Sequence, residues 1–224
     1  MRIEVGKSAK KGTGYILFKI AVRTLTIIPL CIVLFISLYL YTNGENLVFL
    51  ISIPVLFILA YKLFLSKIIT LFHEKIHSLK AETYGYETEL ITDKKWLEKN
   101  TEIKADHKIF DARMKKKKKK INGFCDFKEG VDYNPEHIQK IYLQPLKALF
   151  IIYLLVILVV ILGFVFQKPI AVLIFAYLAI VFASKIEGCS NDIREYFDVR
   201  KNKERIQRMY YKDHRFYIEI KEKE

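Results

Sequence analysis

The sequence has little cysteine, glycine or tryptophan, and its acidic residues are outnumbered by basic ones. Three cysteines, Cys31, Cys125 and Cys189, occur in 224 residues, and no two of them form a C-x-x-C pair. So few cysteines exclude a disulfide-stapled secreted domain and fit a protein with a reduced cytoplasmic face. The 37 lysines and arginines exceed the 24 acidic residues and give a formal net charge of +13. A basic excess of this size favours an anionic partner, such as a lipid surface or a nucleic acid.

Charged residues are almost missing from four stretches of the chain. Each stretch has at most one charge and approaches the roughly 20 residues that a helix needs to cross about 30 Å of hydrocarbon. Ionisable groups that would line a transport path are therefore scarce, which argues against a transporter. No A-x-A cleavage site follows the first stretch, so we expect it to stay attached. The four predicted transmembrane helices are Thr24–Tyr41, Leu47–Tyr61, Leu146–Phe166 and Pro169–Ala183.

Lysine and arginine are scarce on one side of these predicted helices. None occurs in the turn 42–46 and one occurs in the turn 167–168, whereas six precede the first predicted helix. Sixteen lie between His73 and Pro145, and eleven lie from Lys185 onward. Because basic loops stay on the cytoplasmic side, we expect a multi-pass protein of the cell membrane with both termini and the long middle segment in the cytoplasm.

No aromatic stacking motif accompanies the densest run of lysines. Because such a motif is typical of nucleic-acid binding, we expect no nucleic acid as a partner. Next to a cytoplasmic leaflet, each charge of such a run attracts anionic headgroups by about 1 kcal/mol, and acidic peptides are attracted for the same reason. A solvated loop that its charge keeps inside the cell is the simpler account. The run comprises Lys115, Lys116, Lys117, Lys118, Lys119 and Lys120.

The pentapeptide His73-Glu74-Lys75-Ile76-His77 follows the second predicted transmembrane helix. Two histidines four residues apart lie on one face of a helix, so both imidazoles can bind the same divalent metal. A glutamate next to the first histidine can take a proton from a metal-bound water. The alternative is a polar collar where a helix leaves the membrane. The pattern predicts a Zn²⁺ site with Glu74 as the catalytic base.

A catalytic zinc site needs a third protein ligand. In the expected topology the second and fourth helices both run inward, and His73 lies 27 residues past Asn46 while Asp192 lies 24 past Lys168. At 1.5 Å per residue these depths are about 40 Å and about 36 Å, so we predict that Asp192 is the third ligand. The acidic rivals are Glu187, which is the strongest, Glu195 and Asp198, and the remaining histidines are His107, His137 and His214.

The segments outside the predicted membrane helices have a mixed α/β character. Short strands or a hairpin are expected at Tyr84–Tyr86 and around residues 121–124. A turn at 131–135 is expected to precede a short amphipathic helix, Glu136–Leu143. The charged stretch Val199–Met209 predicts a helix. The aromatic and basic stretch Tyr210–Ile220 predicts a strand, which lies in the headgroup region or pairs with the middle segment.

The predicted fold is a mainly α membrane protein. We expect four transmembrane helices in two hairpins, with a metal site at the cytoplasmic face and a small mixed α/β cytoplasmic loop region. The expected divisions are residues 1–72 for the N-terminal segment and first hairpin, 73–145 for the metal-motif helix and cytoplasmic loop, 146–184 for the second hairpin, and 185–224 for the cytoplasmic tail with the predicted third ligand.

Further short motifs accompany the histidine motif along the chain. They are Y-N-P-E at 133–136, L-Q-P-L at 143–146, G-C-S-N-D-I at 188–193 and D-H-R-F-Y at 213–217. With these motifs the chain resembles, from about residue 65 to residue 217, the bacterial multi-pass membrane zincin peptidases, distant relatives of the site-2 proteases. The resemblance implies that His73, His77 and Asp192 are zinc ligands and that Glu74 is the general base. The N-P-D-G motif of the site-2 proteases is absent, and residues 187–191 match the E-x-x-x-[DN] pattern of another group of membrane zincins, so Glu187 stays a rival ligand.

These observations predict a zinc-dependent metalloendopeptidase of the membrane. We expect it to hydrolyse a membrane-associated or membrane-proximal protein substrate at the cytoplasmic face. The alternative is a non-catalytic membrane protein whose lysine run recruits anionic lipid or a protein partner.

Overall fold

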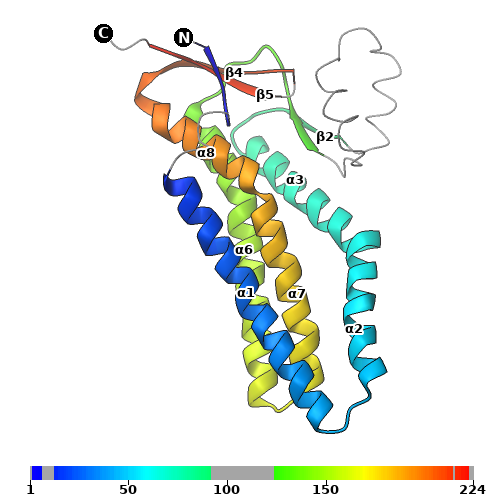
Figure 1. Cartoon of the computed structure of the whole chain (residues 1–224). Coiled ribbons are helices and arrows are strands. Elements are labelled where there is room, and N and C mark those ends of the chain that lie inside the picture. Colours follow the sequence, from blue (N-terminus) through cyan, green and yellow to red (C-terminus); the bar gives the residue numbers. More distant parts are fainter. Residues whose placement is uncertain (1, 7–12, 92–123, 214, 222–224) are drawn as a thin grey trace, which may run out of the picture.

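A computed structural model describes residues 2–6, 13–91, 124–213 and 215–221 of the chain. The protein is mainly helical, with a small region of strands at one end of a bundle of long helices (Figure 1). The lysine run at 115–120, His107 and His214 lie outside the described residues, as does most of the strand expected around 121–124.

Three helical runs within the described residues are long and apolar enough to cross a membrane. They are α1 (Thr13–Thr42), α6 (Pro135–Val165) and the run Pro169–Arg205, whose apolar part is α7 (Pro169–Gly188). Leu34 of α1 and Leu155 of α6 are 63% and 56% exposed, and such large apolar surfaces fit contact with lipid. These helices indicate a membrane protein. The first helix begins at Thr13, earlier than the expected Thr24.

The second apolar segment continues directly into the helix of the histidine motif. It consists of α2 (Leu47–Ala60), a π-helical stretch η2 (Tyr61–Leu65) and α3 (Ser66–Glu82). With 14 residues, α2 is shorter than the other apolar helices. A π-helical stretch has hydrogen bonds that span five residues instead of four, and it changes which face the following residues present. Figure 1 shows α2 to one side of the bundle and α3 leaning from it toward the strands.

The expected separate helix Glu136–Leu143 is wrong, because α6 runs without a break from Pro135 through Pro145 to Val165. Its start is the expected one, since the Asn134 side chain caps it by accepting a hydrogen bond of 2.8 Å from the Glu136 N–H. A proline inside a helix removes one backbone hydrogen bond, and the apolar residues on both sides of Pro145 continue the helix across that gap.

The C-terminal part forms a helix and a hairpin. After α8 (Ser190–Asn202) and a short 3₁₀ turn, η3 (Lys203–Arg205), the chain forms β4 (Ile206–Lys212) and β5 (Arg215–Ile220). The predicted helix to Met209 is therefore too long. The N-terminal strand β1 (Arg2–Glu4) pairs antiparallel with β5, which gives a three-stranded sheet in the order β1-β5-β4.

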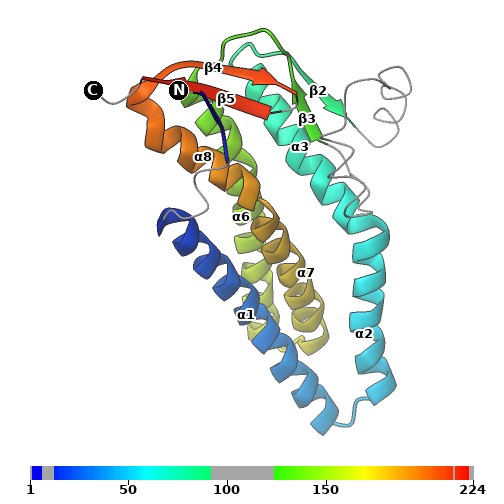
Figure 2. The ribbon, with the colours of Figure 1, turned by 45° about the horizontal axis from the view of Figure 1, so that its top comes forward.

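A second, two-stranded sheet lies beside the end of α3 (Figure 2). Its strands are β2 (Thr88–Ile91) and β3 (Phe124–Phe127), paired antiparallel. The strand expected at Tyr84–Tyr86 is wrong in position, because these residues form the turn after α3, where Gly85 has a φ of 76°.

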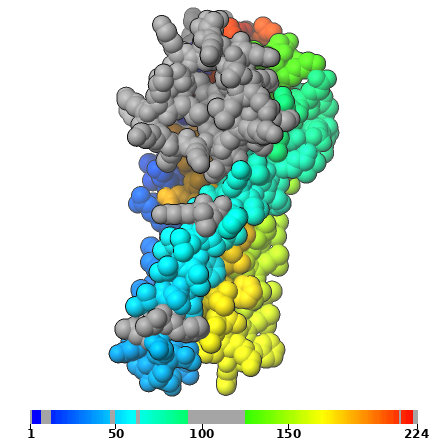
Figure 3. Space-filling view, turned by 90° about the vertical axis from the view of Figure 1, so that its right-hand side faces the viewer, coloured from blue at the N-terminus to red at the C-terminus, as the bar shows by residue number. Residues whose placement is uncertain are grey.

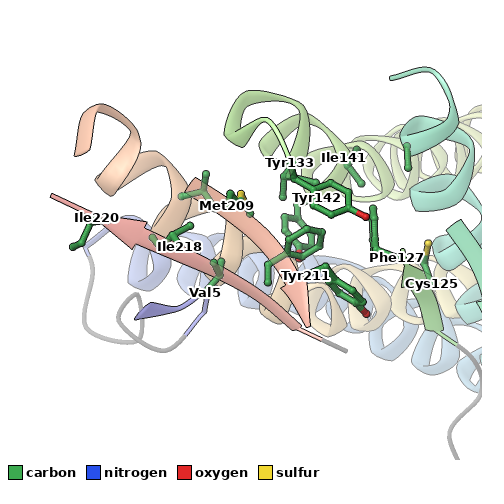
Figure 4. Close-up of a cluster of buried hydrophobic side chains, with 14 residues drawn as sticks. Val5, Cys125, Phe127, Tyr133, Ile141, Tyr142, Met209, Tyr211, Ile218 and Ile220 are labelled. Carbon is green, nitrogen blue, oxygen red and sulfur yellow. The ribbon is translucent and has the colours of Figure 1, made fainter. Parts of the chain in front are cut away.

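A buried cluster joins the two sheets to the ends of α3, α6 and α8 (Figure 4). Val5, Phe127, Tyr133, Met209 and Tyr211 lie in it, so it connects the N-terminus, the middle segment and the tail. The divisions expected after residues 72 and 145 both fall inside helices, α3 and α6. The strand region is therefore packed as one unit with the adjoining ends of these helices.

Candidate metal centre

Helix α3 carries the histidine motif on the face that it turns toward α6 and α8. Its side chains at positions 73 and 77 are 14% and 6% exposed, and the rings of His73 and His77 lie edge to face with their centroids 4.7 Å apart. Their Nε2 atoms are 3.1 Å apart. The spacing of four residues thus directs both Nε2 atoms to one point beside the helix.

Helix α8 supplies a carboxylate to the same point from its first turn. Oδ2 of Asp192 lies 2.9 Å from Nε2 of His73 and 3.3 Å from Nε2 of His77. The structure thus brings Asp192 together with both histidines of the motif.

The other nitrogen of each imidazole is engaged by the protein. Nδ1 of His77 donates to the carbonyl oxygen of Ile141 in α6, at 3.1 Å. Nδ1 of His73 lies 3.5 Å from Sγ of Cys189, the residue between α7 and α8. A histidine whose Nδ1 holds the proton in this way presents the lone pair of Nε2, which is the form that binds a metal.

The three converging atoms fit a small divalent cation. For bonds of about 2.0 Å, the ligands of a tetrahedral zinc ion are about 3.3 Å from one another. The measured separations between the two Nε2 atoms and Oδ2 of Asp192 are 2.9, 3.1 and 3.3 Å. His73, His77 and Asp192 could therefore hold Zn²⁺ as a two-nitrogen, one-oxygen site.

Glu74 lies beside the converging ligand atoms rather than among them. Its Oε1 is 3.9 Å from Nε2 of His73, and its Oε2 accepts a hydrogen bond of 2.9 Å from the backbone N–H of Cys125 in β3. Burial raises the pKa of Glu74 above its ordinary range. A carboxylate held in this way beside a candidate metal site can accept a proton from a water molecule bound to the metal.

Electrostatics couple the acidic and basic groups of the site. Burial lowers the pKa of His73, but the hydrogen bond and negative charge of Asp192 outweigh it, so that this pKa is raised above 6.5. Burial likewise opposes ionisation of Asp192, yet the two histidines hold the pKa of its carboxyl well below its usual range. The aspartate is therefore ionised, as a metal ligand must be.

The rival candidates lie elsewhere. Glu187 is exposed at the end of α7. It belongs to neither of the two groupings of candidate metal-binding side chains among the described residues, which are His73, Cys189 and Asp192, and His73, Glu74 and His77. Asp198 is fully buried and accepts a hydrogen bond of 2.7 Å from the Gly6 N–H, which ties the N-terminal segment to α8. His137 stacks on Tyr84, with ring centroids 4.0 Å apart.

Glu195 lies closer to the centre, one turn after Asp192 on α8. It interacts with the hydroxyl of Tyr142, and burial raises the pKa of Glu195 to about 8. A group that stays protonated near neutral pH is a poorer metal ligand than the ionised Asp192. Among these acidic candidates, Asp192 therefore fits a third ligand position best on both distance and charge.

Sequence reasoning assigned no role to three of the groups around the site. The Cys125 N–H and the Ile141 carbonyl belong to the backbone, so no residue type reveals them. Cys189 is visible in the sequence, but it is separated from His73 by 116 positions, and its role depends on packing.

Comparisons with family models, curated proteins and solved structures found no match to this chain.

Proposed function

We propose that this protein is an integral membrane zinc metalloendopeptidase that hydrolyses a membrane-associated or membrane-proximal protein substrate at the cytoplasmic face. One observation carries the proposal. Three ligand atoms of His73, His77 and Asp192 converge within 3.3 Å of one another, and a buried glutamate lies beside them. Two nitrogens and one carboxylate oxygen, with a glutamate next to them, are what metal-assisted peptide hydrolysis requires.

In this proposal each side chain has a separate task. A bound zinc ion supplies a Lewis acid and lowers the pKa of water toward about 7. Glu74 takes the proton from the attacking water and returns it to the leaving amine. The Cys125 N–H holds the Glu74 carboxylate in place at 2.9 Å, and the Ile141 carbonyl holds the imidazole of His77 at 3.1 Å.

The proposed topology has four transmembrane helices in two hairpins. In the first hairpin α1 is followed by α2, and the crossing of α2 is completed by η2 and the start of α3, since about 20 residues are needed. In the second hairpin α6 is followed by α7. The distribution of lysine and arginine supports a cytoplasmic location for both termini. The antiparallel pairing of β1 with β5 agrees with this, because it requires both termini to lie on the same side.

An apolar stripe on the outer face of α3 supports a membrane-proximal substrate. Phe64 near the end of η2 and Ile68, Phe72 and Leu79 of α3 are 64%, 60%, 44% and 49% exposed. The helical spacing places the three α3 residues on the side away from His73. Exposed lysines, Lys67 and Lys75, accompany the stripe, which is the composition of a helix lying at a membrane surface. Figure 3 views the molecule from the side of α2 and α3. With the stripe in the headgroup layer, the metal centre on the opposite face is near the same level. We propose that the lysines at 115–120 contact anionic headgroups there.

Glu74→Gln tests the enzymatic proposal against the non-catalytic alternative. Because the amide cannot take a proton, we expect hydrolysis to fall by about 10²- to 10⁴-fold while zinc content is unchanged. Glu187→Gln, at an exposed glutamate, is the matched control and should keep full activity. The measurement is cleavage of a library of fluorogenic peptides joined to a transmembrane anchor, with the enzyme in proteoliposomes. Equal rates for Glu74→Gln and the wild type, or no zinc-dependent cleavage by the wild type, would favour the non-catalytic membrane protein that recruits lipid or a partner.

A further inference from the structure

The partner of His77 is a backbone carbonyl that a proline has freed from its own helix. In an α-helix each N–H bonds to the carbonyl four residues earlier. Pro145 lacks an N–H, so the carbonyl of Ile141 receives no such bond within α6. That same carbonyl accepts the Nδ1–H of His77 at 3.1 Å.

A second proline in the protein has the same relationship to a side chain of another helix. Pro29 lies inside α1, and the carbonyl four residues before it belongs to Leu25. The hydroxyl of Tyr153 in α6 donates to that carbonyl at 2.8 Å. In both cases the missing backbone donor is replaced by a side chain that crosses between helices. Buried carbonyls are rarely left unpaired, so the proline and the crossing donor depend on each other.

We propose that Pro145 is a positioning residue for the metal centre, because it reserves the Ile141 carbonyl for His77. This inference rests on the proposed zinc site. Proline acts twice here: it removes the competing N–H, and the clash of its ring with the preceding turn moves the carbonyl away from the helix axis. The carbonyl then fixes the Nδ1–H form of His77 and leaves the Nε2 lone pair for the metal.

Among the described residues, the Ile141 carbonyl is the hydrogen-bond partner of Nδ1 of His77. Its side chain is 6% exposed, so bulk water has little access to Nδ1. Ile141 is fully buried, and the ring of Tyr142 packs edge-on against the imidazole with centroids 5.8 Å apart. If the carbonyl turned back into α6, the buried Nδ1–H would have a weakened partner, and the imidazole would lose the restraint that orients it.

The test is Pro145→Ala, which restores the backbone donor to Ile141. We expect zinc affinity, measured by competition with a chelator, to fall about 10- to 100-fold, the usual effect of losing a group that orients a metal ligand. The melting temperature of the metal-free protein should be unchanged or higher, because alanine suits a helix interior better than proline. Pro29→Ala is the matched control, since it restores the same kind of bond far from the metal, and its zinc affinity should equal that of the wild type.

Opposite changes in metal affinity and metal-free stability separate positioning from a general structural role. A merely structural proline would lower the melting temperature on replacement and weaken zinc binding only as the fold weakens. Equal zinc affinities for Pro145→Ala and the wild type would overturn the proposal while leaving the peptidase proposal intact.

A second measurement does not depend on metal or activity. In metal-free protein labelled with ¹⁵N-histidine, at a pH where the imidazoles are neutral, we expect the proton of His77 on Nδ1 in the wild type and a mixture of tautomers in Pro145→Ala. The His77 signals are assigned by their loss in His77→Gln. The same tautomer distribution in both proteins would refute the role of Pro145, whatever the enzyme does.

Discussion

His73 and His77 each direct Nε2 toward the candidate metal site, and the Nδ1 of each contacts another protein atom. The two Nδ1 contacts differ in strength. His77 donates to a carbonyl, a strong acceptor, whereas His73 lies next to the thiol of Cys189, a weak one. The orientation of His73 therefore depends more on its contact with Asp192. This aspartate has two tasks, because it is both a candidate ligand and the partner that sets the charge of the neighbouring imidazole.

The raised pKa of His73 predicts how zinc binding depends on pH. Since Asp192 stabilises the protonated imidazole, the ring keeps its proton to a pH above 6.5, and a metal must displace that proton. Zinc affinity should therefore be greatest at higher pH and begin to fall before the pH has dropped to 6.5. Competition titrations with a chelator between about pH 6 and pH 8, the range in which histidine titrates, measure this. An affinity that stays constant down to pH 6.5 would contradict the coupling to Asp192.

At this scale the sequence predicts the side chains of the site but not the backbone groups that support them. The four-residue spacing places His73 and His77 on one face of α3, and counting residues from the outer turns brings Asp192 to them. Pro145 reads in the sequence as a boundary, because a proline usually ends a helix. That its freed carbonyl accepts a proton from His77 depends on how α3 packs against α6, over 64 positions of sequence.

Among the elements, β3 carries none of the proposed ligands, yet it contacts the proposed catalytic base directly. Its Cys125 pairs with Leu90 of β2, yet the Cys125 N–H points away from β2 to the carboxylate of Glu74. One hydrogen bond to a carboxylate thus joins β3 to α3, the helix of the histidine motif. This contact was not predictable, since the expected strands in the middle segment were shifted by several residues from their observed positions.

Cys125→Pro removes that N–H without removing a bond between β2 and β3. A hydrogen bond to a charged group contributes about 1.5–3 kcal/mol, so we expect hydrolysis to fall about 10- to 100-fold with zinc content unchanged. Cys125→Ser keeps the N–H and is the control. Zinc content and peptide cleavage are measured for both variants, and equal activity of the two would show that β3 does not hold the base.

At the scale of the whole molecule, we propose that the metal centre lies at the level of the cytoplasmic headgroups. His73 lies six residues beyond Lys67, a distance of about 9 Å along the helix axis. Because α3 leans, the two residues differ by less than this in their depth along the membrane normal. Headgroup layers add roughly 5–8 Å on each side of the hydrocarbon core. The long apolar helices and their order can be predicted from composition. The pairing of the N-terminal strand β1 with the C-terminal hairpin β4–β5 could be seen only in the structure.

Tryptophan fluorescence measures this depth. In a Trp96→Phe background, which removes the single native tryptophan, Phe72→Trp in proteoliposomes should be quenched by lipids brominated near the headgroup. Phe35→Trp on α1 is the control inside the bilayer, and Lys212→Trp in β4 is the control in water. Quenching of Phe72→Trp by aqueous acrylamide but not by bromolipid would place α3 outside the membrane surface. Protection from both quenchers would mean that protein covers the stripe, such as a second copy of this chain.

The central claim is the three-ligand zinc site, and elemental analysis of the detergent-purified protein tests it most directly. We expect about one zinc per chain in the wild type and in Glu187→Ala, and loss of zinc in His73→Ala and Asp192→Ala. Retention of zinc in Asp192→Ala together with its loss in Glu187→Ala would move the third ligand to Glu187. Absence of zinc from every sample, even after anaerobic reconstitution, would contradict the metal site and the peptidase proposal with it.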